Sequence, residues 1–430
     1  MFEKLNLLIP LGNYFRNKSI QNFLFLSFIQ SSNVLISIIS MPLLIQSIGL
    51  DQFGLVNLAL SVIAMLNILV AFGYNLSAPR EVAINREDKT ALSRIVSNVF
   101  SAKVFLAGIA SLIVLVAAFG LGLFSEYRII LIFSLLLLFS EATLPLWFFQ
   151  GREKMKLVSI ANVFSKLLFL LGIVLFIHSP EQSKWVNFML GLLGLGINLL
   201  LLGYIHTFLD IRFYRPEFKA IWKSLRENVL LFLSNFASFI SINGGLIILS
   251  FFSNAETLGM YSLAERVVMV LRLFPALIVQ AIFPNASKLY QEDANRFYRF
   301  LRRVHIRVLL LGVVVFAGVY LTAPWIIQIL SRSTLDESVS YLQVLSAIPF
   351  LACMNIGNVT LMLVADLKKL LFRASWMMCV YMVVVSAILT SMLGGIGLCI
   401  GILSTEVIVF LICLVLLYRH NRTLFRGYYS

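Results

Sequence analysis

Seven ionisable side chains lie within long apolar stretches, where charged residues are rare. They are Lys103, Glu141, Lys166, Glu265, Arg266, Arg272 and Glu406. An ionised side chain at the centre of a lipid bilayer costs on the order of 3 kcal/mol. Such side chains therefore face the protein interior or a water-filled cavity, where cationic groups can bind an anionic substrate. The same charges could instead pair with one another and hold helices together, and the residue types leave both roles open.

Three of these residues occur in the single apolar stretch 259–283. In a helix, Glu265 and Arg272 share a face because they are seven residues apart, whereas Arg266 points elsewhere. At about 1.5 Å per residue, Arg272 would lie roughly 20 Å from the start of the stretch. We therefore expect Arg272 and Arg266 to line a cationic binding cavity, with Glu265 a candidate for ion pairing or coupling.

The other four charges are spread over four different stretches. Lys103 and Lys166 lie close enough to the expected cytoplasmic ends of their stretches for a lysine stem to snorkel partly toward the surface. We predict that both contribute to the cationic cavity. Glu141 and Glu406 fall near the middle of theirs, and either could pair with the lysines or carry a coupling proton.

The composition sets the class of protein in which these charges lie. The chain is 60% hydrophobic and only 13% charged, whereas soluble domains carry about 25% charged residues. A globular enzyme is thereby excluded, and a multi-pass membrane protein is indicated. No catalytic set, metal-ligand spacing or nucleotide motif occurs, and the four cysteines fall in apolar runs. We predict no enzyme activity, cofactor or metal.

Twelve segments are long and apolar enough to span a membrane, since a span needs about 20 residues. The sequence thus predicts an all-α membrane protein with about 12 transmembrane helices. Residues 324–338 could begin an interfacial helix, and prolines within spans are expected to bend them. The predicted spans are 20–47, 52–77, 95–122, 128–149, 157–178, 185–208, 228–252, 259–283, 304–323, 339–363, 373–392 and 397–418.

Orientation follows from the distribution of basic residues. Of the 34 Lys and Arg, 27 fall on one side of the predicted spans, in termini and loops or within four residues of a span end, and 3 fall likewise on the other. Because cytoplasmic loops are enriched in Lys and Arg, both termini are expected in the cytoplasm. The net charge of +14 then reflects topology and attraction to anionic lipid headgroups, and no nucleic-acid partner is predicted.

The stretch 51–94 recurs 205 residues later as 256–299. Ten of the 44 aligned positions are identical, including Gly54/Gly259 and Asp88/Asp293, whereas composition alone gives roughly three or four. The offset matches a division into two lobes of six spans, which are related by a parallel internal repeat. The predicted domains are an N-terminal lobe (1–208), a cytoplasmic linker (209–226) and a C-terminal lobe (227–430).

Several short segments resemble a known family. Gly54-Leu-Val-Asn-Leu-Ala59 follows an acidic turn, Phe72-Gly73 and Pro79-Arg80-Glu81 come next, and Gln150-Gly151-Arg152 precedes Ile160-Ala161-Asn162. In these segments and in its twelve spans, the chain is similar to polysaccharide (O-antigen) flippases of the multidrug/oligosaccharidyl-lipid/polysaccharide exporter superfamily. The resemblance implies a MATE-like fold and no catalytic residues.

The resemblance also implies the substrate and the setting. It implies an O-antigen or capsule repeat unit on a polyprenyl diphosphate, translocated across the bacterial inner membrane by alternating access for lipopolysaccharide or capsule synthesis. Arg272, Arg266, Lys103 and Lys166 match the central cationic cavity that the family is expected to have. Expected partners are this lipid, membrane lipids and polysaccharide polymerase machinery. The first span carries no charge, which disfavours a peptidoglycan precursor.

Two other functions are weighed against a flippase. A multidrug cation antiporter of the same superfamily would need acids in its cavity without compensating bases, whereas the spans here hold four bases and three acids. A membrane polymerase or ligase of O-antigen would need a sizeable outer loop, and the largest predicted outer stretch, 324–338, is short. Both functions are therefore disfavoured.

Overall fold

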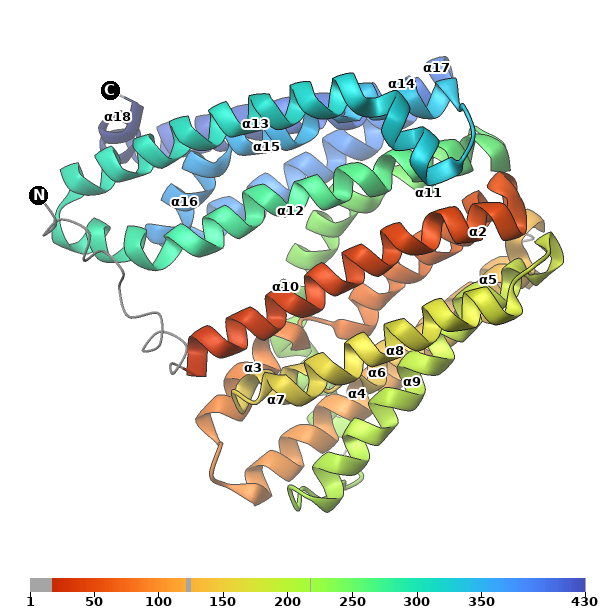
Figure 1. Cartoon of the computed structure of the whole chain (residues 1–430). Helices are drawn as coiled ribbons and strands as arrows, with labels where there is room; N and C mark the ends of the chain where they lie inside the picture. The colour runs from red at the N-terminus through yellow and green to blue at the C-terminus, as the bar shows by residue number, and fades with distance from the viewer. Residues whose placement is uncertain (1–17, 121–124, 217, 430) are drawn as a thin grey trace, which may run out of the picture. The chain divides into compact units, whose positions relative to one another are not determined.

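The described part of the chain is almost entirely helical (Figure 1). The computed structural model describes residues 18–120, 125–216 and 218–429, and these contain no strand. Within them, nine helical segments are long and apolar enough to cross a membrane. The prediction of an all-α, multi-pass membrane protein is therefore confirmed, while the number of twelve crossings stays a prediction.

The bounds of the helices follow in chain order. They are α2 (Lys18–Ala71), α3 (Tyr74–Ile84), α4 (Lys89–Leu115), η1 (Val116–Gly120), η2 (Ser125–Tyr127), α5 (Arg128–Ser134), α6 (Leu136–Thr143), α7 (Leu146–Gly151), α8 (Met155–Phe176), η3 (Pro180–Gln182), α9 (Ser183–Thr207), α10 (Phe218–Asn243), α11 (Gly245–Leu249), α12 (Ala255–Glu292), α13 (Ala294–Ser331), α14 (Asp336–Leu345), α15 (Ile348–Met354), α16 (Ile356–Val364), α17 (Lys368–His420) and α18 (Arg422–Tyr429).

Two of the longest helices are interrupted by a glycine. Gly49 in α2 has φ 82° and ψ 165°, and Gly394 in α17 has φ 60° and ψ −141°. Glycine adopts these conformations without the strain that a Cβ would cause. Each helix therefore consists of two apolar helices that meet at the glycine, as the paired predicted spans on either side of it require.

Two aspartates start helices in the same way. The Asp88 side chain accepts hydrogen bonds from two backbone N–H groups at the start of α4, and Asp293 does the same for α13. Such caps satisfy N–H groups that have no partner within the helix. The alignment of 51–94 with 256–299 equates these two residues, so their identity has a local structural reason. The repeat itself stays a prediction.

The chain forms two compact units. Unit 1 comprises the described residues up to Ser40 together with Ile63–Leu233, and unit 2 comprises Met41–Val62 together with the described residues from Ser234 onward. Helices α2 and α10 thus contribute to both units. Each unit has its own buried apolar cluster, around Phe148 in unit 1 and around Phe297 in unit 2.

Within unit 2, α2 and α12 approach each other through glycine. A Cβ placed on Gly54 would lie 2.5 Å from the backbone nitrogen of Gly259 and 2.5 Å from the carbonyl oxygen of Ala255. Such a distance is far below van der Waals contact, so the absence of a side chain permits the approach. These contacts hold Asn57, one turn further along α2, beside the same helix.

Two of the prolines within predicted spans lie at or near the ends of helices. Pro145 lies at the break between α6 and α7, and Pro349 lies in the first turn of α15. Residues 324–331 are not a separate interfacial helix, because α13 continues through Pro324 and ends at Ser331. Helix α10 begins at Phe218, so the end of the predicted linker is helical.

Candidate functional site

Arg272 lies within unit 2 between three helices. It extends from α12, and its guanidinium pairs with the carboxylate of Glu406 on α17. It also donates a hydrogen bond of 3.2 Å to the carbonyl oxygen of Ile242, at the end of α10. The two paired side chains are only 13% and 11% exposed. The sequence left the partner of Glu406 open between a lysine and a proton, and the structure gives it an arginine instead.

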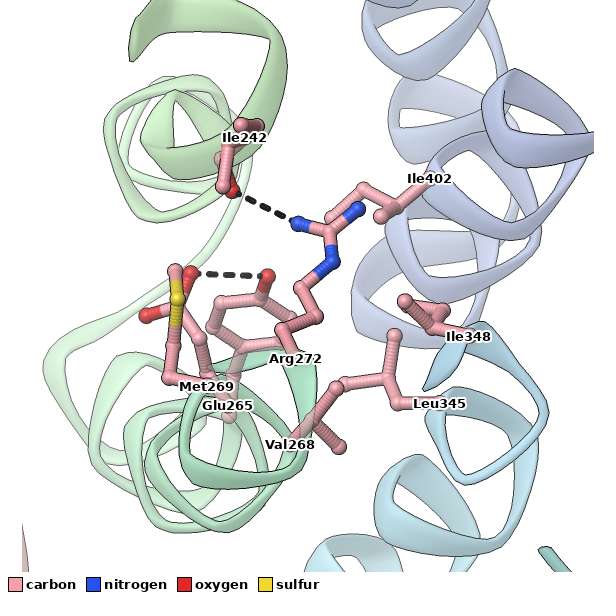
Figure 2. A pocket seen from close by; sticks show the side chains of 9 residues that line it. Ile242, Glu265, Val268, Met269, Arg272, Leu345, Ile348 and Ile402 are labelled. Atoms are coloured by element: carbon pink, nitrogen blue, oxygen red, sulfur yellow. Dashed lines mark hydrogen bonds between the residues drawn. The ribbon is translucent and has the colours of Figure 1, made fainter. Parts of the chain in front are cut away.

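The face of α12 that holds Arg272 also holds Glu265, as their seven-residue spacing predicted. Figure 2 shows both side chains beside a small hollow, with Arg272 directed toward Ile242 and Ile402. The Glu265 carboxylate accepts a hydrogen bond of 3.1 Å from the Tyr261 hydroxyl. We call this space the arginine hollow; its volume of about 10 Å³ has room for about one water molecule. Its other lining residues are apolar, namely Ile242, Val268, Met269, Leu345, Ile348 and Ile402.

Arg266 points away from the arginine hollow, again as its spacing predicted. Its Nη2 donates a hydrogen bond of 2.9 Å to the side-chain oxygen of Asn57 on α2. The Asn57 amide is itself held by a bond of 2.8 Å to the Phe53 carbonyl oxygen. Arg266 therefore joins α12 to α2 and is not among the residues that line the arginine hollow.

Unit 1 contains the second intramembrane ion pair. The ammonium of Lys103 on α4 lies 3.3 Å from the carboxylate of Glu141 on α6. Lys103 is 1% exposed and Glu141 is 22% exposed. Of the two possibilities that the sequence left for Lys103, the structure has the pairing with Glu141, because its side chain turns inward and does not snorkel. Hydrocarbon cannot solvate an ammonium, and the carboxylate supplies the partner that water would otherwise provide.

A larger and more polar hollow lies beside this pair. It has a volume of about 250 Å³, and α2, α6, α8 and α9 contribute to its wall. We call it the amide hollow after its four asparagines. Its polar lining residues are Asn33, Asn67, Ser140, Glu141, Asn162, Ser165, Lys166 and Asn198. Lys103 is not among them and reaches this hollow only through Glu141.

The structure thus separates the predicted site residues into four settings. Arg272 lines the arginine hollow, and Lys166 lines the amide hollow. Arg266 and Lys103 line neither hollow, because Arg266 is bonded to Asn57 and Lys103 is paired with Glu141. Sequence reasoning missed Asn57, although it lies within the segment that carried the family resemblance. It also missed Asn33 and Asn198, since a single asparagine in an apolar stretch gives little signal by itself.

This arrangement suits binding and exchange of partners rather than bond-breaking chemistry. Each ion pair consists of a cation and a carboxylate from different helices, with at least one member beside a hollow. An incoming anion can compete with the carboxylate for the cation, because charge-assisted hydrogen bonds to phosphate and carboxylate are similar in kind. The two pairs can therefore stabilise helix packing and also respond to an anionic ligand.

Comparison with known sequences places the chain among proteins of polysaccharide synthesis. The profile of a family described as "Polysaccharide biosynthesis protein" matches residues 19–290. A protein of Escherichia coli (strain K12) named "Putative O-antigen transporter" is 22% identical over 405 residues, which cover 94% of this chain and 97% of that protein. A protein of Shigella dysenteriae with the same name is 26% identical over 92% of this chain and 98% of its own.

Solved structures share the fold at low sequence identity. One described as "Lipid II flippase MurJ, inward closed conformation" has a TM-score of 0.72 and 13% identity, and covers 91% of this chain and 87% of its own. An inward-facing multidrug resistance transporter of the MATE family has a TM-score of 0.68 and 15% identity, over 91% and 99% of the two chains. The expected MATE-like fold is confirmed.

Proposed function

Because the chain belongs to the polysaccharide biosynthesis protein family, we propose that it is a flippase for lipid-linked oligosaccharide. Its substrate would be an O-antigen or capsule repeat unit joined by diphosphate to a polyprenyl carrier. The names of the relatives from Escherichia coli and Shigella dysenteriae support this assignment. The protein would act in the bacterial inner membrane with both termini in the cytoplasm, as an exporter and not as an enzyme.

The ion pair between Arg272 and Glu406 is the observation that carries the mechanism. A diphosphate entering an apolar membrane protein loses its hydration and needs compensating cations. Arg272 offers a planar guanidinium that can bind phosphate oxygens in a bidentate way. Displacement of Glu406 by the diphosphate would loosen the contact between α12 and α17, and the carboxylate would re-form the pair when the substrate leaves. Binding and helix movement would thereby be linked.

The lysines would play different parts in this mechanism. Lys166 lines the amide hollow and would contact the substrate directly. Lys103 would set the position of Glu141, since the ammonium and the carboxylate lie 3.3 Å apart. Arg266 would hold α12 against α2 through Asn57. Glu141, Glu265 and Glu406 would take part in ion pairing or in coupling to an ion gradient. Membrane lipids and a polysaccharide polymerase would be the partners.

Replacement of Arg272 by alanine tests this proposal. We expect Arg272→Ala to abolish surface polysaccharide in a strain that depends on this protein. We expect the same of Arg272→Ala/Glu406→Gln, in which no uncompensated carboxylate remains to destabilise the protein, and whose abundance in the membrane should be normal. Removing Lys288, an exposed residue paired with Glu292 four positions away, provides the control with the same loss of charge. Normal polysaccharide export by Arg272→Ala would remove this residue from the substrate path.

Drug export by the same fold is the competing function, and the chain's own charges argue against it. A site for organic cations needs unpaired carboxylates, whereas the carboxylates of Glu141 and Glu406 are each paired with a base. Glu265 lies on the same hollow as Arg272. Drug-susceptibility measurements on a deletion strain would reveal a cation exporter, since such a strain would become sensitive to cationic dyes while retaining surface polysaccharide.

A further inference from the structure

The amide hollow of unit 1 has a polar wall at a depth where the surrounding stretches are apolar. Its cavity volume of about 250 Å³ lies just below the range of about 300–1,000 Å³ that is typical of ligand pockets, so it suits a part of a ligand rather than a whole one. Amide, hydroxyl, carboxylate and ammonium groups reach it from four helices, and no aromatic ring lines it. This wall is unsuited to a flat hydrophobic drug and suited to a ligand that forms many hydrogen bonds.

Three asparagines of this wall lack hydrogen-bond partners for their side-chain oxygens. The Oδ1 atoms of Asn33, Asn67 and Asn162 are shielded from solvent, and none has a partner among the described residues. Leaving such a group unsatisfied costs about 1–3 kcal/mol, and buried polar groups in folded proteins are nearly always paired. The fourth asparagine of the wall, Asn198, donates from its Nδ2 to the carbonyl oxygen of Ser140 at 2.8 Å. The side-chain oxygens of the other three are therefore acceptors that a ligand could pair with.

The charges around the hollow restrict the kind of ligand. Glu141 is balanced by Lys103 behind the wall, and Lys166 adds a second ammonium. The sum of the three charges is positive, which disfavours an inorganic cation. A simple anion could pair with Lys166 but would offer no donor to the amide oxygens. A hydroxyl group both donates and accepts, so it can pair with an amide in either orientation and with an ammonium as well.

We propose that the amide hollow binds the sugar part of the substrate through its hydroxyl groups. This inference rests on the proposed flippase function and adds a division of tasks to it. The side-chain amides of Asn33, Asn67 and Asn162 would turn to pair with sugar hydroxyls, and Lys166 would donate to hydroxyl or ring oxygens. The Glu141 carboxylate, held in place by Lys103, would be a further acceptor.

Binding measurements with two lipids test this division. The full-length protein in lipid nanodiscs is titrated with lipid-linked oligosaccharide, extracted from a host strain that lacks the protein, and separately with undecaprenyl diphosphate. We expect Asn67→Ala and Asn162→Ala each to weaken binding of the glycosylated lipid about 2- to 10-fold, the loss of one hydrogen bond. Binding of undecaprenyl diphosphate should stay unchanged. Asn67→Ser, which keeps a hydroxyl, should lose less than Asn67→Ala.

A matched control lies in the same unit. Asn187 is fully buried and donates to the Ser134 hydroxyl at 2.9 Å, but it does not line the amide hollow. Asn187→Ala should therefore leave both affinities unchanged. Equal losses for the two lipids in the Asn67 and Asn162 variants would overturn sugar recognition, as would unaltered binding of both. If the unmodified protein binds neither lipid, the flippase function itself fails and this inference fails with it.

Discussion

Lys103 shows how a single buried charge depends on its partner. Its side chain is 1% exposed, and its ammonium lies 3.3 Å from the Glu141 carboxylate. Removing one member of a buried ion pair typically costs about 3–5 kcal/mol, because the other charge is left without compensation. Replacing both members by neutral groups costs much less. A comparison of the single variants with the double variant therefore measures the interaction between Lys103 and Glu141.

We predict that Lys103→Met lowers the free energy of unfolding by about 3–5 kcal/mol. The double variant Lys103→Met/Glu141→Gln should recover most of this loss, because no uncompensated carboxylate remains. Thermal unfolding of the purified proteins in detergent provides the measurement. If the double variant is as unstable as the sum of the single variants, the two groups do not interact in the way that their distance implies.

Asn57 is a second residue whose role rests on one partner. It accepts a hydrogen bond of 2.9 Å from Arg266, and hydrogen bonds to charged groups contribute about 1.5–3 kcal/mol. We predict that Asn57→Ala destabilises the protein by this amount. Asn57→Asp, which keeps an oxygen acceptor for the guanidinium, should be close to normal. Equal melting temperatures for the alanine variant and the unmodified protein would show that Arg266 does not need this partner.

At the scale of elements, the approach of α2 to α12 depends on two glycines. A Cβ on Gly259 would collide with the backbone carbonyl of Leu50, and one on Gly54 would lie 2.5 Å from the Gly259 nitrogen. Backbone atoms cannot move aside as the end of a flexible side chain can. The two helices would have to separate. The hydrogen bond between Arg266 on α12 and Asn57 on α2 would lengthen as a result.

We predict that Gly259→Ala destabilises the protein by about 1–3 kcal/mol, the usual cost of overpacking. Gly108 is the matched control, since it lies within α4 and a Cβ there would meet no atom within 4 Å. Gly108→Ala should be neutral or stabilise by up to about 1 kcal/mol, because alanine restricts the unfolded chain. A comparison of thermal unfolding of the two variants separates packing from helix propensity.

The same elements show what the sequence could and could not predict. The opposite directions of Glu265 and Arg266 on α12 followed from helix geometry, because that periodicity is a property of one helix. The pairing of Lys103 with Glu141 joins residues 38 positions apart on different helices, and periodicity carries no information about such contacts. The hydrogen bond between Arg266 and Asn57 could not be predicted for the same reason, although Asn57 lies in the segment Gly54–Ala59 that resembles the family.

Helix interruptions were predictable only in part. Proline marks a break by its missing N–H, so the ends near Pro145 and Pro349 could be anticipated. Glycine is ambiguous, because it permits both a break and close packing. Gly394 and Gly395 are adjacent, yet the first has positive φ and the second packs against the Tyr341 ring. Only the folded structure separates these two uses.

At the scale of the whole molecule, the distribution of charge is the main evidence for orientation. The predicted cytoplasmic segments hold 27 of the 34 Lys and Arg, and translocation of basic residues across the membrane is disfavoured. Lys219 lies at the start of α10 among several basic residues. Ser331 ends α13, whose second half is apolar and includes the exposed residues Leu321 and Trp325. These two ends should therefore face opposite sides of the membrane.

We predict that alkaline phosphatase fused after Ser331 is active, since this enzyme folds only outside the cytoplasm. The same enzyme fused after Lys219 should be inactive, and green fluorescent protein should give the reverse pattern at both positions. Helix α13 runs without interruption from the basic residues near Arg299 to Ser331, at about 1.5 Å per residue far enough to cross the hydrocarbon core. Equal reporter signals at the two positions would mean that α13 does not cross, and the assignment of both hollows to depths within the bilayer would fail with it.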